Sequence, residues 1–335
     1  MTGSAENQTN PVETDGLLFG CVLNGKGGAR IVDWQEVESW KADDGPLWVH
    51  MDRNSPHVQS WLKQRSGLTQ PTVTALLAEE TRPRVFRGKK GIATILRGIN
   101  HNTEASPEDM VAIRIWSDGN KLITLRHRRL MTPRDVLSQL VEFENGPRTI
   151  SQLYERLVTR LTERMSATVI SFDEKLDVLE ADIDITKAAR LRRELSDIRQ
   201  DTVVLRRYMA PQREALNSLL IEPPVWLDDE CRMHLRDTAD RLLRYVEELD
   251  AARERSLIIK DDIANQLAES SNKTLYILAI ISAIFLPLAF LTGLLGINIG
   301  GIPGIDNPYA FWIFCATMAV LLVIELLIFR HLKWL

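Results

Sequence analysis

Short apolar runs separated by turn residues fill the chain from about residue 16 to residue 147. Such runs, rich in β-branched and aromatic residues, are typical of strands. Strands are predicted at residues 17–23, 47–51, 92–99, 110–116 and 121–126. Asn24-Gly25 and Asp118-Gly119 predict hairpin turns. Helices are predicted between these elements, at residues 57–64, 72–78 and 133–143. Alternation of strands and helices predicts an α/β cytoplasmic domain with a mixed or antiparallel sheet.

From residue 148 the apolar positions follow a helical period, and glycine is absent until Gly293. Helices are predicted at residues 151–183 and 187–220, the second with Pro211 as a kink site. A third begins near Leu227 and has no helix breaker before the next apolar segment, so it could continue up to that segment as one long helix. Residues 148–273 therefore predict a cytoplasmic helical bundle and a long stalk.

Two long apolar segments follow, at residues 274–299 and 310–329. Each is long enough to cross about 30 Å of hydrocarbon. Residues 300–309 between them are rich in glycine and proline. We therefore predict two transmembrane helices joined by a short external loop, as a C-terminal hairpin.

Charges at the ends of these segments predict their orientation. Lys273 precedes the first segment, and Arg330 and Lys333 belong to a basic tail at residues 330–335. The loop carries one acid, Asp306, and no Lys or Arg. Positive charge stays on the cytoplasmic side, so both chain ends should be cytoplasmic. The polar residues 1–15 are predicted to be a disordered tail.

One face of the first apolar segment carries small or polar residues at several helical steps. It comprises Asn272, Leu275, Ala279, Ser282, Leu286, Ala289 and Gly293. Pro287 lacks a backbone donor and frees the carbonyl of Ala283. This face could line an ion path or pack against another helix, because small residues serve both purposes in lipid. Two helices cannot enclose a path, so a pore would require several copies of the chain.

The sequence carries few other motifs that indicate binding or catalysis. The net charge of −4 gives no reason to expect nucleic acid as a partner, and three distant cysteines do not form a disulfide framework. Gly20 to Lys26 fits the start of a phosphate loop but lacks the following Ser or Thr, which favours a hairpin turn. With no Ser-His-Asp arrangement or metal-hydrolase motif, we expect no enzyme activity and no cofactor.

Two further sites each have two interpretations. Cys231 and His234 are spaced to share a helix face and could bind a secondary zinc ion, although a capped helix start with Cys231 buried explains them more simply. Glu325 is the one acid within the second apolar segment. It could pair with Arg330 or take part in proton coupling.

The end of the first apolar segment carries a family signature. The stretch PLAFLTGLLGIN at residues 287–298 resembles the CorA family of divalent-cation transporters, in which a Gly-x-Asn tripeptide closes the pore-lining helix. Here the tripeptide is Gly296-Ile297-Asn298. The loop GINIGGIPG, the ending KWL, and LWVHMD and EETRPR at residues 47–52 and 79–84 resemble the ZntB zinc-transporter branch. The resemblance spans nearly the whole chain.

This resemblance implies a funnel-shaped homopentamer in the bacterial inner membrane, in contact with lipids, with zinc as the transported ion. Five Asn298 side chains would ring the outer mouth, where neutral amide oxygens attract a cation and still release it. The zinc branch implies proton-coupled uptake; efflux and a magnesium channel are alternatives within the family. The alternative from a different functional class is a membrane-anchored scaffold or signalling protein.

Overall fold

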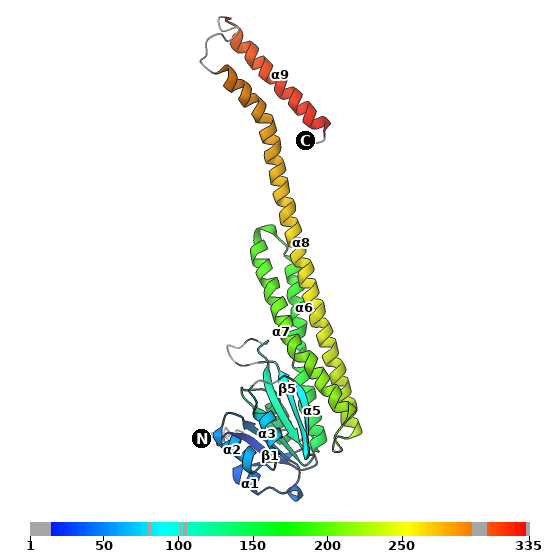
Figure 1. Ribbon diagram of the computed structural model, residues 1–335. Helices are drawn as coiled ribbons and strands as arrows, with labels where there is room; N and C mark the ends of the chain where they lie inside the picture. Colours follow the sequence, from blue (N-terminus) through cyan, green and yellow to red (C-terminus); the bar gives the residue numbers. More distant parts are fainter. Residues whose placement is uncertain are drawn as a thin grey trace, which may run out of the picture. The chain divides into compact units, whose positions relative to one another are not determined.

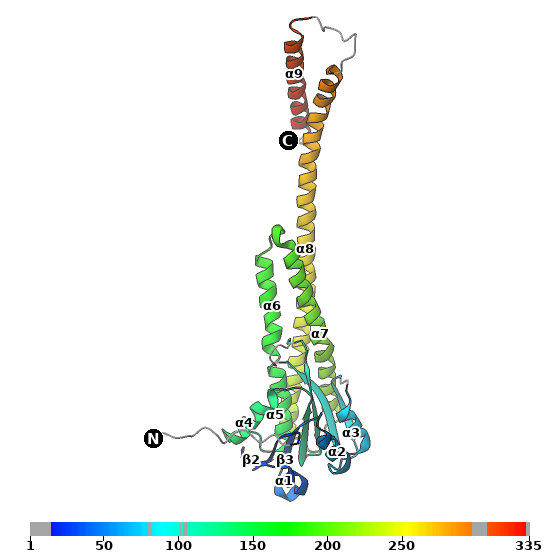
Figure 2. The same cartoon turned by 90° about the vertical axis from the view of Figure 1, so that its left-hand side faces the viewer.

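The computed structural model describes residues 15–79, 82–100, 102, 106, 108–296 and 307–332. The chain divides into two units, residues 1–259 and 260–335. The first unit is an α/β domain with long helices (Figures 1 and 2). The second contains two helical segments. One helix, α8 (Asp229–Leu295), contributes residues to both units.

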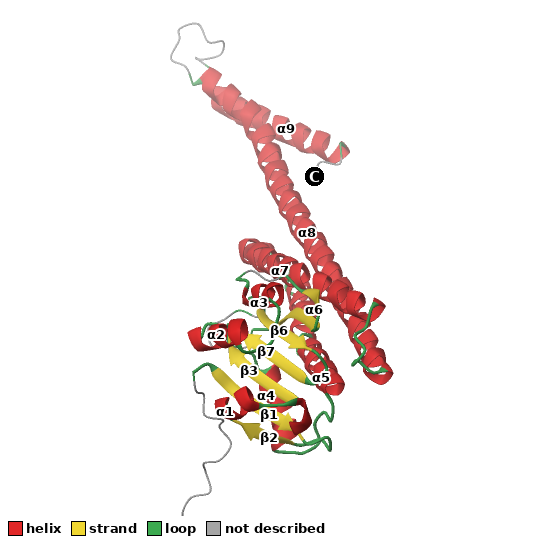
Figure 3. Ribbon diagram, turned by 60° about the horizontal axis from the view of Figure 1, so that its bottom comes forward, coloured by secondary structure: helices red, strands yellow, loops and turns green. Residues whose placement is uncertain are grey.

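A seven-stranded mixed sheet forms the base of the first unit (Figure 3). The strands lie in the order β2-β1-β3-β7-β6-β5-β4. Their bounds are β1 Leu17–Leu23, β2 Ala29–Val32, β3 Leu47–Asp52, β4 Arg84–Gly88, β5 Gly91–Gly98, β6 Val111–Ser117 and β7 Lys121–Arg126. β3 and β7 run parallel, and the other neighbouring pairs are antiparallel. The predicted mixed α/β sheet is confirmed.

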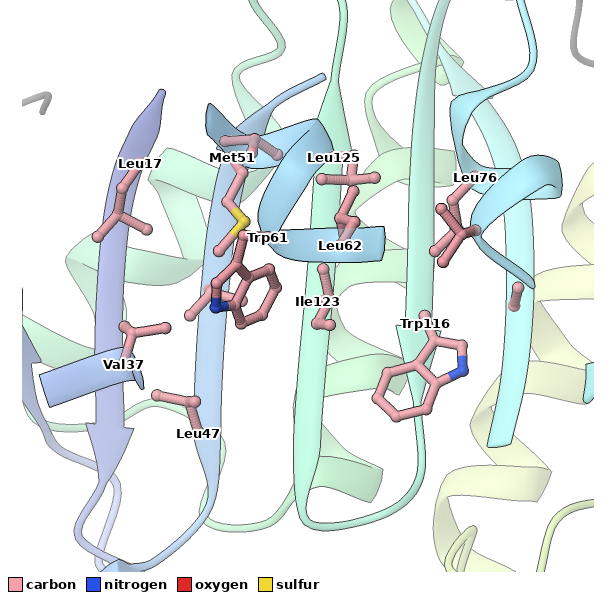
Figure 4. Close-up of a cluster of buried hydrophobic side chains, with 14 of the residues drawn as sticks. Leu17, Val37, Leu47, Met51, Trp61, Leu62, Leu76, Trp116, Ile123 and Leu125 are labelled. Atoms are coloured by element: carbon pink, nitrogen blue, oxygen red, sulfur yellow. The ribbon is translucent and has the colours of Figure 1, made fainter. Parts of the chain in front are cut away.

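Three short helices cover one face of the sheet: α1 (Trp34–Ser39), α2 (Pro56–Gln64) and α3 (Gln70–Leu77). Their apolar side chains, such as Trp61 and Leu76, pack onto alternate strand residues such as Met51, Ile123 and Leu125 (Figure 4). Only alternate strand residues reach these helices, because successive side chains of a strand point to opposite faces of the sheet. Each large aliphatic side chain buried in this way contributes about 1.5–3 kcal/mol.

The opposite face is covered by α4 (Thr132–Val141) and α5 (Ile150–Glu163). Tyr154 of α5 is buried and its hydroxyl lies 2.7 Å from that of Thr94 in the middle of β5. With helices on both faces, the central strands are buried on both sides and lose the apolar–polar alternation of a half-exposed strand. All seven residues of β1 are buried, for example.

The helices after the sheet differ from prediction at one point. Instead of one helix at 151–183, α5 ends at Glu163 and α6 runs from Ser166 to Ala181. No Gly or Pro marks the break. The break coincides with tertiary contacts: Arg164 binds Asp135 of α4 at 2.6 Å, and Met165 is fully buried. α7 (Ala188–Ile221) contains Pro211 without ending there.

Several small elements were not predicted. β2 and β4 are the edge strands, α1 is a single short helix, and two 3₁₀ turns lie at Ala42–Asp44 and Ile185–Lys187. β4 reads RVFRG, and its charged residues hide the strand pattern. The two predicted turns are confirmed, with β1 joined to β2 through residues 24–28 and β6 joined to β7 through Gly119 at φ +98°.

Candidate functional site

The second unit contains the two predicted apolar helical segments. They are the end of α8 and α9 (Ala310–His331). Both are long and apolar enough to cross a membrane, and their most apolar 18-residue windows are not buried. An apolar core helix of a water-soluble protein would be covered by other elements. This combination of length, apolar composition and exposure fits two transmembrane spans.

The two faces of α8 in this unit differ in exposure. The seven residues that the sequence predicts to line a pore are all exposed: Asn272, Leu275, Ala279, Ser282, Leu286, Ala289 and Gly293. Half-buried residues lie on the opposite side of the helix: Ile280, Ile284, Pro287, Leu288 and Leu291. At 100° per residue the two sets are separated by about half a turn. The half-buried positions therefore lie opposite the predicted pore-lining face, and the other residues of the segment, including Phe285 and Phe290, are exposed.

The predicted tripeptide lies at the end of this helix. Gly296 is the last described residue before the connection, and its N–H donates to the carbonyl of Thr292 at 2.9 Å. A Cβ at position 296 would lie 2.9 Å from that oxygen, so the close approach favours glycine. Ile297, Asn298 and Asp306 lie outside the described residues, and their roles stay predictions.

α9 has one covered stripe. Its half-buried or buried positions recur every three or four residues, as on one side of a helix. They are Ala310, Phe314, Met318, Leu321, Leu322, Glu325 and Phe329. Glu325 therefore lies on the covered side of α9. Its Oε2 is buried without a hydrogen-bond partner, and no ion pair joins it to Arg330 within the described residues.

The structure favours the simpler interpretation of Cys231. Asp228 caps the start of α8, and its Oδ1 accepts the N–H of Cys231 at 2.8 Å. Cys231 is buried, and burial raises the pKa of its thiol to about 12, which disfavours the thiolate that a metal would need. His234 is exposed, with Nδ1 4.0 Å from Glu155 Oε1. Among the described residues, no group of three or more His, Cys, Asp or Glu could hold a metal.

Known proteins share this arrangement. A family model described as CorA-like Mg2+ transporter protein matches residues 43–331. The chain belongs to this family. The CorA-like match includes most of the α/β sheet, the long helices and both apolar segments, and leaves out β1, β2 and α1.

Two curated CorA-like relatives match over nearly their full length. The divalent cation transporter CmaX of Pseudomonas aeruginosa is 36% identical over 323 residues, covering 96% of this chain and 97% of the relative. The zinc transport protein ZntB of Pectobacterium atrosepticum is 34% identical over 324 residues, covering 97% and 98%. The resemblance recognised from the tripeptide is confirmed.

Solved structures agree with this fold. The full-length CmaX structure superposes with a TM-score of 0.80 at 36% identity, covering 96% of this chain and 98% of that one. The CorA magnesium transporter of Methanocaldococcus jannaschii also gives 0.80, at 18% identity, covering 95% and 98%. The latter likeness shows a shared fold of an α/β domain, a long helix and C-terminal apolar helices.

Proposed function

We propose that this chain is the subunit of a divalent-cation transporter of the bacterial inner membrane. In the proposed assembly, five copies surround an axis, and the α8 segment of each copy lines the ion path. The copies' α/β domains form a cytoplasmic funnel, and both chain ends are cytoplasmic. The basic groups at Lys273, Arg330, His331 and Lys333 then lie at the inner membrane face, where they can contact anionic lipids.

The observation that carries this proposal is the exposed face of α8. Ser282, Ala289 and Gly293 lie on the side that the chain leaves uncovered, while the apolar Leu288 and Leu291 are half-buried. A single helix that served only as a lipid anchor would not need small and polar residues on its exposed side, whereas packing against another copy of the chain would use them. In an oligomer these residues can face an aqueous axis.

Zinc is the ion that we propose, because ZntB relatives match the whole chain and the tripeptide has Ile297 in its middle. Uptake coupled to protons is the proposed mechanism. Zinc efflux and magnesium conduction are the alternatives within the family, and the CmaX relative is named only for divalent cations. Metal uptake into vesicles with and without a proton gradient, comparing zinc with magnesium, separates these possibilities.

Substitution of Asn298 tests whether the chain forms an ion-conducting pore. In liposomes, Asn298→Ala should lower zinc flux by about tenfold, equivalent to ~1.4 kcal/mol of lost ion stabilisation, because the amide ring at the outer mouth disappears. Asn307→Ala is the matched control, an amide in the same connection. Asn298→Ala flux equal to that of the wild type would favour the membrane-anchored scaffold.

Glu325 is the residue that we propose for proton coupling. Its carboxyl lies on the covered side of α9 and has an unpartnered oxygen, and an acid in a membrane segment needs either a proton or a cation. Glu325→Gln should therefore abolish the dependence of zinc flux on the proton gradient. Glu269→Gln, an exposed acid of α8, is the control. Unaltered gradient dependence in Glu325→Gln would remove this residue from the mechanism.

A further inference from the structure

A buried arginine in the middle of the sheet has unused hydrogen-bonding capacity. Arg114 of β6 is 1% exposed. Its Nη2 donates to the carbonyl of Ala78 at 2.9 Å, at the end of α3, but its Nε and Nη1 are buried and have no hydrogen-bond partner. Those two nitrogens carry three N–H donors. Leaving such donors of a charged group unpaired is costly, so this residue calls for an explanation.

No ion pair among the described residues compensates the charge of Arg114. Arg53 lies beside it and donates to the carbonyls of Leu77 and Ala78 at 2.9 and 2.8 Å. Burial first, and then the positive charges of Arg53 and Arg97, lower the pKa of Arg114 to about 10. The guanidinium is thus still charged at neutral pH and already desolvated, with two further arginines near it.

Arg114 lines a cavity of about 260 Å³. Arg97, His127 and Arg128 line the same cavity, and the Arg97 guanidinium is fixed 4.2 Å from the ring centre of Tyr208. Glu79, Glu108 and Asp109 also contribute to the wall. His127 and Arg128 are exposed, so the cavity opens to solvent on their side, with the buried guanidinium in its wall.

We propose that this cavity binds a small tetrahedral oxyanion such as inorganic phosphate, with Arg114 as the principal donor. Guanidinium groups at several positions suit an anion with oxygens in several directions. Because Nε and Nη1 have almost no exposed surface, binding requires a side chain of the cavity wall to move aside. The desolvation cost of Arg114 is already met in the folded state, which favours binding.

Thermal unfolding of the full-length protein in detergent tests this proposal. Inorganic phosphate should raise the wild-type Tm by about 2–4 °C in a saturable manner, relative to chloride at equal ionic strength. Arg114→Gln should lose this shift, and Arg236→Gln, an exposed arginine on α8, should retain it. A wild-type shift no larger than that with chloride, or an equal shift in Arg114→Gln, would overturn the proposal.

A tethered anion gives a second test that does not require removal of Arg114. Ala112 lies two residues away on the same side of β6, lines the cavity and is half-buried. Ala112→Glu should raise the Tm above that of its neutral counterpart Ala112→Gln and should abolish the phosphate shift. If Ala112→Glu and Ala112→Gln respond equally to phosphate, the anion does not bind at Arg114.

Discussion

His50 lies in the centre of the sheet and is 2% exposed. Its Nδ1 is 2.9 Å from Thr124 Oγ1, which also accepts the indole N–H of Trp48 at 3.0 Å and donates to the carbonyl of Val49. Burial, followed by the positive charges of Arg126 and Arg134, lowers the pKa of His50 to about 3. The imidazole is therefore neutral in the folded protein over the physiological pH range.

His50 should make stability depend on pH. An unfolded histidine titrates near pH 6.5, so between that pH and about 3 the unfolded chain binds a proton that the native state excludes. The free energy of unfolding should fall by up to ~1.4 kcal/mol per pH unit as the pH decreases through this window. Chemical denaturation of the wild type and His50→Asn, which can keep a bond to Thr124, measures the difference.

The control for this prediction is His57→Gln, which removes an exposed histidine. It should leave the pH dependence unchanged, whereas His50→Asn should flatten it. An equally steep loss of stability in His50→Asn and the wild type would show that other groups govern the acid response.

At the scale of elements, one side chain of α7 forms a hydrogen bond with the backbone of β5. Gln212 is fully buried, and its Oε1 accepts the backbone N–H of Arg97, near the end of β5, at 2.7 Å. Its own Nε2 has no hydrogen-bond partner. The side chain follows Pro211 in the helix, and it provides the acceptor that a neighbouring strand would otherwise supply to β5.

Replacing this acceptor should be costly. Gln212→Leu removes the side-chain oxygen that accepts the Arg97 N–H, so the free energy of unfolding should fall by about 1–3 kcal/mol. Gln200→Leu, on an exposed position of the same helix, should change it by less than about 0.5 kcal/mol. The difference in denaturation midpoint between the two variants measures the effect. Equal midpoints would mean that water or another group replaces the amide.

Local patterns predicted the elements that are buried on both sides. The apolar runs at β1, β3, β5, β6 and β7 and the turns at Asn24-Gly25 and Asp118-Gly119 are strong signals, and all are confirmed. The edge strand β4 was missed because two arginines interrupt its apolar residues. The break at Arg164 was missed because contacts with Asp135 on another helix accompany it, and a one-dimensional pattern does not contain such contacts.

The candidate functional residues can likewise be divided into those that the local pattern predicted and those that were missed. Spacing alone predicted which residues of α8 share one side, because the helical period determines this, and their pore-lining role stays a prediction. Arg114 was missed, although a charged residue within the apolar strand VAIRIWS is a visible signal. The structure shows no ion pair between Glu325 and Arg330, since spacing on a helix permits an ion pair without requiring one, and the role of Glu325 stays a prediction.

For the whole molecule, the central claim is that the exposed face of α8 lines a path for metal ions. A cysteine on that face should be reachable from water in the assembled protein, whereas one on the half-buried side should not. Ser282 and Leu288 occupy these two positions. Cys315 is exposed, whereas Cys21 and Cys231 are buried, so Cys315→Ala provides the background for this comparison.

The most direct measurement is zinc flux into liposomes before and after treatment with a cationic methanethiosulfonate reagent. In Ser282→Cys, modification should place a positive charge in the path and reduce flux by about tenfold or more, since a fixed cation repels a divalent ion. Leu288→Cys should be unaffected. Unchanged flux in Ser282→Cys after complete labelling would contradict the assignment of α8 as the lining of the path.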